Sequence, residues 1–332
     1  MIRVTLCGIG GVGKAIVRLA RDRQGLKVVA AYSRGSRVVG TDVGALAGGP
    51  EIGVNVTERV TALRTESDIL LIATTPFLRD VLPEVLAGVE ARLNVVSTAE
   101  EMAFPWHVDP RLAREIDEAA RTAGVSVVGV GANPGYIYEI VGLALTGAVQ
   151  RVDRVEVRRV VDLSGFGEIV QRRLGIGFDA AEFAQGIRDH AIHGHIGFPH
   201  TIRTFGRRLD VDIERVDEVV EPILTDHPLI AHSVETHPGR SVGIRQRATG
   251  IVDGRPWFKA EFIGHIAPRS AGLEPEDAYV IEGVPTIRAT VSPGFDPQTT
   301  TASVLANVMP RVLAAHPGLL SVVDLPIPTP WR

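Results

Sequence analysis

The sequence has only one cysteine, Cys7, and no long run of apolar residues. A single cysteine cannot close an internal disulfide, and it excludes a cysteine-based metal cluster. No stretch approaches the roughly 18 consecutive apolar residues that a membrane-spanning helix needs, and Met1 is followed almost at once by the first expected strand. The sequence therefore predicts a soluble cytoplasmic protein with no membrane partner, in which Cys7 packs in the core.

A large net charge and a metal-ligand pattern are also missing. The net charge of -4 does not favour nucleic acid as a partner. The sequence has 10 histidines, but His190, His193 and His195 lie among glycines, without a supporting carboxylate or cysteine at ligand spacing. We therefore expect no metal site and no nucleic-acid partner. The length of 332 residues is sufficient for two domains.

The most informative motif is G-x-G-x-x-G, which follows a short apolar run at the start of the chain. Residues 4–7 are typical of a buried strand, residues 14–23 carry apolar side chains at helical spacing, and a second strand is expected at 26–32. In such a βαβ unit the helix N-terminus binds a pyrophosphate, and the glycines allow a tight turn and a close approach of the backbone. The expected cofactor contacts of the turn are Gly8, Gly10, Gly11, Val12 and Gly13.

The end of the second expected strand indicates which nicotinamide cofactor binds. In NAD-dependent proteins an acid about 20 residues beyond the glycines holds the ribose hydroxyls, but this region contains Ser33, Arg34 and Arg37. Hydroxyl and guanidinium groups suit a 2′-phosphate, which a carboxylate would repel. Asp42 lies too far along the chain to replace the missing acid. We expect NADP(H) as the preferred cofactor, with NAD(H) as the alternative.

Strands and helices alternate through the first part of the chain. A helix is expected at 78–87, and another begins at Asp109-Pro110 and ends at Gly124. Continuous apolar strands joined by helices form a parallel sheet that is covered on both faces. Residues 1–147 are therefore predicted to form a Rossmann domain. Its further strands are expected at 69–73, 93–97 and 125–130.

From residue 148 the sequence alternates between apolar and polar residues, for example at 155–160 and 246–252. Such alternation is typical of half-buried strands in an antiparallel or mixed sheet. A last helix near 300–315 is expected to pack back on the first domain, with Pro310 kinking or ending it. The predicted fold is α/β: an N-terminal Rossmann domain (1–147, with 300–332 packed on it) and a second α+β domain (148–299) built on a mixed or antiparallel sheet.

Three strand ends converge where a Rossmann domain holds the nicotinamide. Only the middle one carries ionisable groups, Glu100 and Glu101, and repulsion between adjacent carboxylates can raise the pKa of one toward the range of acid/base catalysis. The run 98–101 also fits the Ser/Thr-x-x-Glu capping box of a helix start. In that case Glu101 is structural and Glu100 faces the substrate, but the sequence leaves this choice open. The other two strand ends offer Thr74, Thr75 and Asn133 as cofactor contacts.

At these positions the sequence resembles the 2,4-diaminopentanoate dehydrogenases and the related native amine dehydrogenases. The most specific segments are 94–105, with its Ser-Thr-Ala-Glu-Glu run, and the Gly-His-x-Gly-Phe run at 194–198. The resemblance spans nearly the whole chain and continues through 131–135, 158–164, 317–319 and 324–326.

The resemblance implies a Rossmann domain joined to a sheet-based domain that forms a homodimer. It implies NAD(P)H-dependent reductive amination of a ketone or aldehyde with ammonia, and the reverse oxidative deamination. A glutamate of the Ser-Thr-Ala-Glu-Glu run would orient and deprotonate the amine. This chemistry passes through a cationic iminium, which a carboxylate can stabilise while it moves protons. The candidate substrate contacts are Tyr136, Phe166, His195 and Phe198.

Two other functions stay open. One is a dihydrodipicolinate reductase-like activity, although 188–194 lacks the paired histidines and the lysine of that family. The other is an NADP-binding redox sensor without turnover, which would need the glycine turn but no carboxylate at the nicotinamide. The sequence does not identify the carbonyl substrate, because the candidate contacts are mostly apolar.

Overall fold

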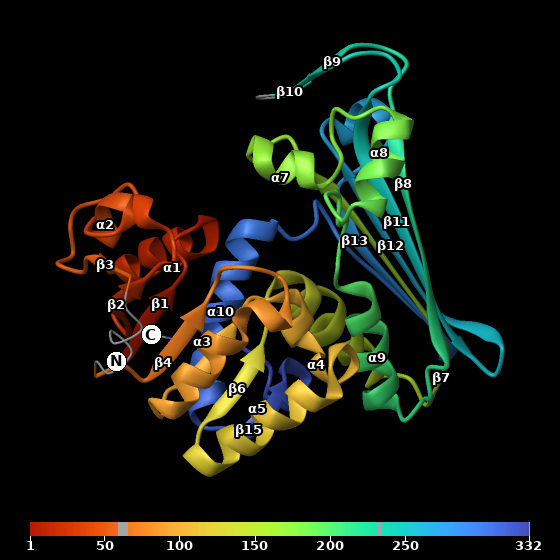
Figure 1. Cartoon of the computed structure of the whole chain (residues 1–332). Coiled ribbons are helices and arrows are strands. Elements are labelled where there is room, and N and C mark those ends of the chain that lie inside the picture. Colours follow the sequence, from red (N-terminus) through yellow and green to blue (C-terminus); the bar gives the residue numbers. More distant parts are fainter. Residues whose placement is uncertain (59–65, 232–233, 332) are drawn as a thin grey trace. The chain divides into compact units, whose positions relative to one another are not determined.

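The computed structural model describes residues 1–58, 66–231 and 234–331. The chain forms two compact units (Figure 1), the first made of Met1–Ile140 with Asp296–Arg332 and the second of Val141–Phe295. Both boundaries fall a few residues before those expected from the sequence, 147 and 299. Within the described ranges, no helix is both long and apolar enough to cross a membrane.

The first unit is built on a seven-stranded sheet in the order β15-β6-β5-β4-β1-β2-β3, and all of its strand pairs are parallel. All four residues of its central strand β4 are buried, as a strand covered on both faces requires. This sheet confirms the Rossmann-type fold. Its strands are β1 (Ile2–Cys7), β2 (Leu26–Tyr32), β3 (Val56–Thr57), β4 (Ile69–Ile72), β5 (Asn94–Ser97), β6 (Ser126–Gly129) and β15 (Gly318–Ser321).

Helix α5 begins and ends at capping residues that the sequence provides. The carboxylate of Asp109 accepts the backbone N–H groups of Arg111 and Leu112 at the start of α5, and Gly124 ends that helix with φ 74°. The helices of the first unit are α1 (Gly11–Asp22), α2 (Val43–Leu46), α3 (Leu78–Glu90), α4 (Pro105–Val108), α5 (Pro110–Ala123) and α10 (Pro297–Leu313), with helical turns at η1 (Ser36–Val38), η3 (Glu100–Ala103), η4 (Ala132–Val141, kinked) and η6 (Val322–Asp324).

The last helix, α10, packs against α1 and continues through Pro310 to Leu313, so the proline does not end it. Pro310 has no N–H to donate to the carbonyl of Ala306, four residues earlier. The indole N–H of Trp331 donates to that carbonyl instead, at 2.8 Å. The guanidinium of Arg23 lies 5.2 Å from the Trp331 ring centroid. The C-terminal segment therefore contacts α10 and Arg23, the residue that follows α1.

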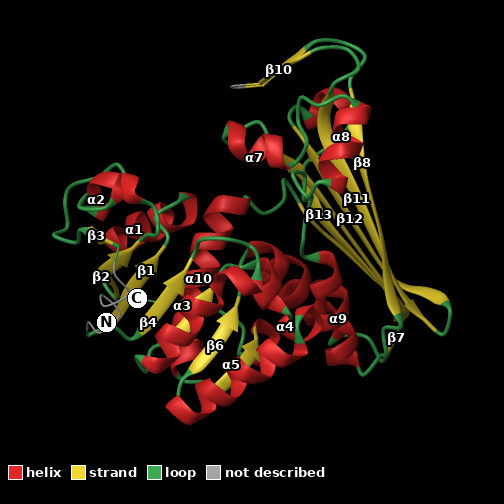
Figure 2. Cartoon of the chain, viewed as in Figure 1, coloured by secondary structure: helices red, strands yellow, loops and turns green. Residues whose placement is uncertain are grey.

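The second unit contains a six-stranded mixed sheet in the order β14-β13-β7-β12-β11-β8. Figure 2 shows its long strands in yellow. The pair β7 and β12 is parallel, and the other pairs are antiparallel. This confirms the mixed sheet predicted from the alternating residues. Its strands are β7 (Arg151–Asp162), β8 (Arg215–Leu224), β11 (Ser241–Val252), β12 (Arg255–His265), β13 (Glu276–Val284) and β14 (Ile287–Val291), and β9 (Leu229–Ala231) pairs separately with β10 (Val234–Thr236).

The two faces of this sheet differ in chemistry. On one face, Phe205 of α9 packs edge-on against Phe258 of β12, with ring centroids 4.9 Å apart. On the other face, Arg158 of β7 forms ion pairs with Glu261 at 3.1 Å and Glu276 at 2.5 Å. The helical elements of this unit are α6 (Gly142–Thr146), α7 (Glu168–Arg173), α8 (Ala180–Arg188), α9 (Phe198–Leu209) and η5 (Pro268–Ala271).

Candidate active site

The glycine turn between β1 and α1 leaves room for a pyrophosphate. Gly8 has φ +97°, and a Cβ there would lie 2.3 Å from the carbonyl oxygen of Ala73. A Cβ at Gly13 would lie 2.2 Å from the carbonyl oxygen of Gly8, so the helix packs directly on the turn. At Gly10 and Gly11, in contrast, a Cβ would meet nothing within 4 Å. Two glycines are thus required by packing, and two leave the backbone open to a ligand.

The start of α1 supplies donors to that space. The helix begins at Gly11, and its N-cap Gly10 has no side chain that could bond the first N–H groups, which include that of Val12. Free N–H groups and the helix dipole favour an anion at this position. Thr74 borders the turn, because its Cγ2 would lie 2.8 Å from a Cβ at Gly8, and the hydroxyl of Thr75 donates to Asp80 at 3.0 Å. The residues present fit a dinucleotide.

At the end of β2, the guanidinium of Arg34 is bound by a carboxylate. Its Nε donates to Oε1 of Glu84 at 2.5 Å, and its Nη2 donates to Oε2 of Glu84 and, at 2.8 Å, to the carbonyl of Asp80. The hydroxyl of Ser33 accepts the N–H of Gly35 at 3.2 Å. The side chain of Arg37, on η1, is exposed and makes no hydrogen bond or ion pair with residues 1–58, 66–231 or 234–331. No sequence motif indicates Glu84, because it lies 50 residues from its partner.

Asp42 is a structural residue. It is buried before α2, and its carboxylate accepts the backbone N–H groups of Gly44 at 2.7 Å, Ile52 at 3.1 Å and Val54 at 2.9 Å. These bonds occupy both carboxylate oxygens, so Asp42 holds the α2 segment together.

The capping box that the run 98–101 fits does not form at the end of β5. The hydroxyl of Thr98 donates to the carbonyl of Ile72 at 3.4 Å, and η3 begins after Ala99 without a side-chain cap. The Oε2 of Glu101 instead accepts the backbone N–H of Leu78 at 2.7 Å, at the start of α3. The reason is that the first turn of α3 presents unpaired N–H groups there. Glu101 therefore caps α3.

The two adjacent carboxylates have different surroundings. Burial raises the pKa of Glu101, and the hydrogen bond from Leu78 opposes this effect only in part. The negative charge of Asp80 adds a smaller increase. The raised pKa thus arises mainly from burial rather than from the repulsion between neighbours considered for the sequence. Glu100 is half-buried and begins η3 at the carboxyl end of β5.

The segment η4, which follows β6, contains a buried carboxylate that no sequence motif indicates. Glu139 is 2% exposed, and its Oε2 accepts the N–H of Gly135 at 2.7 Å. Within the described ranges, the buried Oδ1 of Asn133 has no hydrogen-bond partner. The N–H of Tyr136 donates to Gly131 at 3.1 Å, and its ring packs on the core of the first unit. The only sequence signal for Glu139 is one acidic residue inside the apolar run 137–141.

In the second unit, the structure brings His195 and Phe198 together. The His195 ring meets Phe198 edge-on, with centroids 4.9 Å apart. Its backbone is held by the side-chain amide of Gln246, which accepts the N–H of His195 at 2.7 Å and donates to its carbonyl at 2.8 Å. Burial, and then the charge of Arg159, lower the pKa of His195 to about 3. His195 is therefore neutral at neutral pH.

The buried Nε2 of His195 has no hydrogen-bond partner in the part of the chain that the structure describes. Nearby, Arg159 and Asp277 form a buried ion pair of 2.7 Å, and Arg159 also donates to the carbonyl of Phe295 at 2.7 Å. Phe166 lies in the turn after β7, where its N–H donates to Leu163 at 3.1 Å. Among the described residues, no group of three or more His, Cys, Asp or Glu side chains is arranged to hold a metal ion.

Comparisons with known proteins agree along the whole chain. The family described as 2,4-diaminopentanoate dehydrogenase C-terminal domain matches residues 136–332, and the N-terminus of dihydrodipicolinate reductase matches residues 2–99. The chain is 31% identical over 333 residues to the 2,4-diaminopentanoate dehydrogenase of Acetoanaerobium sticklandii, covering 98% of this chain and 94% of that protein. It is 24% identical over 353 residues to an amine dehydrogenase of Streptomyces virginiae, covering 98% and 97%.

The solved structure of an amine dehydrogenase from Mycobacterium smegmatis superposes with a TM-score of 0.87 at 25% identity, covering 100% of this chain and 97% of that one. The likeness to dihydrodipicolinate reductase is limited to the nucleotide-binding part, whereas the likeness to the amine dehydrogenases includes both units. The chain belongs to the 2,4-diaminopentanoate dehydrogenase family.

Proposed function

We propose that this chain interconverts a primary amine with the corresponding ketone or aldehyde and ammonia, with NADPH as its preferred hydride donor and Glu100 as its acid/base residue. The family makes the chain an NAD(P)-dependent oxidoreductase that acts on amines. The observation that carries the proposal is the pair of carboxylates at the carboxyl end of β5, in the same unit as a turn that fits a pyrophosphate.

Glu100 is assigned from its place: it is half-buried at the carboxyl end of β5, where a Rossmann domain holds the nicotinamide. Glu101 caps α3 through Leu78 and cannot turn toward a ligand without giving up that bond. In reductive amination, ammonia adds to the carbonyl, and water is lost to give a cationic iminium. A carboxylate that takes a proton from ammonium, so that ammonia can add, and returns it to the carbinolamine hydroxyl as water leaves then faces the iminium in its charged form, which lowers both barriers. When bound, the nicotinamide cofactor supplies the hydride that completes the reaction.

The preference for NADPH is proposed from the residues that follow β2. Ser33, Arg34 and Arg37 are hydroxyl and guanidinium groups, and they suit a 2′-phosphate. Asp42, the next acid along the chain, is engaged by three backbone N–H groups at 3.1 Å or less and does not replace the missing ribose acid. NADH stays the alternative cofactor, because Glu84 occupies two donors of Arg34.

The proposed substrate contacts of the second unit are His195, Phe198 and Phe166. A neutral, buried imidazole nitrogen suits one hydrogen bond to an uncharged polar group of the substrate, and the phenyl rings suit its apolar part. For the first unit we propose Tyr136 as a further contact. These assignments favour a small, mostly apolar carbonyl compound.

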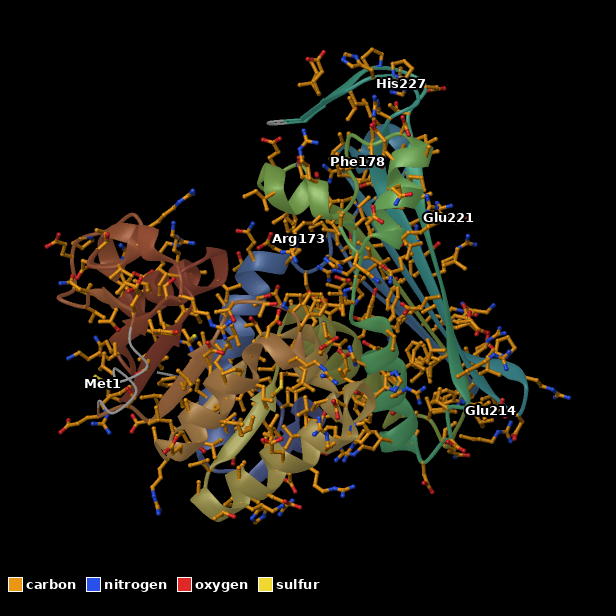
Figure 3. The ribbon with its side chains drawn as sticks, in the orientation of Figure 1. Met1, Arg173, Phe178, Glu214, Glu221 and His227 are labelled. Carbon is orange, nitrogen blue, oxygen red and sulfur yellow. The ribbon has the colours of Figure 1, made fainter. Side chains whose placement is uncertain are left out.

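We also propose a homodimer formed through the charged face of the second unit's sheet. Arg158 pairs there with Glu261 and Glu276, and Arg247 pairs at 2.5 Å with Glu221. Figure 3 labels Glu221 on β8. This face also contains a hollow of about 490 Å3. Because cations and anions alternate across it, a second copy related by a two-fold axis presents complementary charges.

The test of the proposed reaction is a panel of small ketones, aldehydes and amino-ketoacids, each assayed with NADPH in the presence and absence of ammonium. The proposal expects NADPH oxidation only when carbonyl compound and ammonium are both present. Oxidation without ammonium would identify a carbonyl reductase. Tight NADPH binding with no turnover on any member of the panel would favour a redox sensor.

A further inference from the structure

Glu84 is a buried carboxylate that binds Arg34 at the end of β2, where the adenosine ribose of the cofactor is expected. It lies on α3 with 4% of its surface exposed, whereas the side chain of Arg34 is 48% exposed. Both carboxylate oxygens accept hydrogen bonds from Arg34, and the Asp80 carbonyl accepts a third. A bidentate pair of this kind fixes the plane of the guanidinium as well as its position.

The Arg34–Glu84 ion pair has no net charge. It lies at the end of β2, where a 2′-phosphate would need a cationic partner. A buried carboxylate is screened by salt and water much less than a surface one, so its field reaches its neighbours. After burial, the charge of Glu84 is the next contribution that raises the pKa of Cys7 to about 12. It likewise adds to the raised pKa of Tyr32, which ends β2. The positive charge of Arg34 opposes this effect of Glu84 on both groups, so both charges of the pair act at the ends of β1 and β2.

We propose that Glu84 sets the cofactor selectivity of this enzyme through Arg34: it fixes the guanidinium at the end of β2 and offsets the guanidinium charge. The protein therefore prefers NADPH only modestly and keeps NADH as a usable cofactor. Glu84 acts through Arg34, so it is a positioning residue. The inference rests on the proposed function, because it concerns the nucleotide site of that reaction.

The experiment is Glu84→Gln in the full-length protein, with dissociation constants for NADPH and NADH measured by nucleotide fluorescence at one fixed ionic strength. Glutamine keeps the volume and one acceptor oxygen, so the substitution isolates the charge. Loss of the carboxylate charge should tighten NADPH binding by on the order of tenfold and leave NADH binding within about twofold. Glu90→Gln is the matched control, because it removes the same charge from the exposed end of the same helix and should change neither constant.

A second pair of variants tests the same idea if Glu84→Gln alone does not fold. Arg34→Ala leaves the buried carboxylate without its cation, so it should weaken NADPH binding more than NADH binding. Adding Glu84→Gln to Arg34→Ala removes the repulsion and should recover part of the lost NADPH affinity. Absence of that recovery would overturn the proposal.

Two other results would also decide the matter. Glu84 has only a structural role if Glu84→Gln weakens NADPH binding, or if it changes the dissociation constants of NADPH and NADH equally. In that case the inference fails while the proposed function stands. If the parent protein binds neither nucleotide, the proposed function fails, and the inference fails with it.

Discussion

Replacing Glu101 by alanine removes the carboxylate that accepts the Leu78 N–H at 2.7 Å, at the first residue of the 13-residue helix α3. Phe77, which precedes the helix, supplies no side-chain cap that could take over. Loss of an N-terminal acceptor costs about 1 kcal/mol, with a range of about 0.5–2. For a unit of this size, that corresponds to a fall in melting temperature of about 2–4 °C per kcal/mol.

The assay for this prediction combines thermal unfolding, followed by circular dichroism, with steady-state turnover. Glu101→Gln is the conservative comparison, because its amide oxygen still accepts a hydrogen bond, so it should lose less stability than Glu101→Ala. Both variants should keep most of the parent turnover. Glu101→Ala with an unchanged melting temperature and a large loss of turnover would refute the assignment and move the catalytic role to Glu101.

Three further outcomes are expected. Trp331→Phe should lower the free energy of unfolding by about 1–2 kcal/mol, because it leaves the Ala306 carbonyl unpaired. In a Pro310→Ala background this loss should be smaller, because the introduced alanine supplies an N–H to that carbonyl. A loss of equal size in both backgrounds would count against the contact. His195→Asn should flatten the pH dependence of stability: the depressed pKa of His195, about 3 against an ordinary 6.5, gives stability that is complete above pH 6.5 and lost as the pH falls toward 3. Between pH 3 and 6.5, His195 contributes at most about 1.4 kcal/mol per pH unit to the slope of the free energy of unfolding against pH. Urea titrations that give the same slope for His195→Asn as for the parent would contradict this prediction. Arg158→Glu should convert a dimer into a monomer in light scattering at micromolar concentration, and a dimer that survives would argue against the proposed interface.

Much of the fold was predictable because its signals are local. The buried strand β4 is a continuous apolar run, β7 alternates between apolar and polar residues, and Asp109 and Gly124 mark both ends of α5. Each of these features depends on residues within a few positions of one another. The sequence therefore indicated the parallel sheet, the mixed sheet and the glycine turn.

The partners of the site residues were not predictable in the same way. Glu101 has a local partner in the capping-box pattern, but in the structure it bonds Leu78, 23 residues earlier. Glu84 binds Arg34 across 50 residues, and Gln246 holds His195 across 51. Contacts over such separations depend on how strands and helices pack, and they leave no periodic pattern in the sequence.

The proposed reaction joins ammonia to a carbonyl compound, with Glu100 as the acid/base residue. The most direct measurement is ammonium-dependent NADPH oxidation by the parent protein and by Glu100→Gln, with NADPH affinity measured on both. We predict that oxidation requires ammonium, and that Glu100→Gln slows it by on the order of a hundredfold while the dissociation constant for NADPH is unchanged. Oxidation that does not need ammonium, or a Glu100→Gln variant that turns over at the parent rate, would contradict the claim.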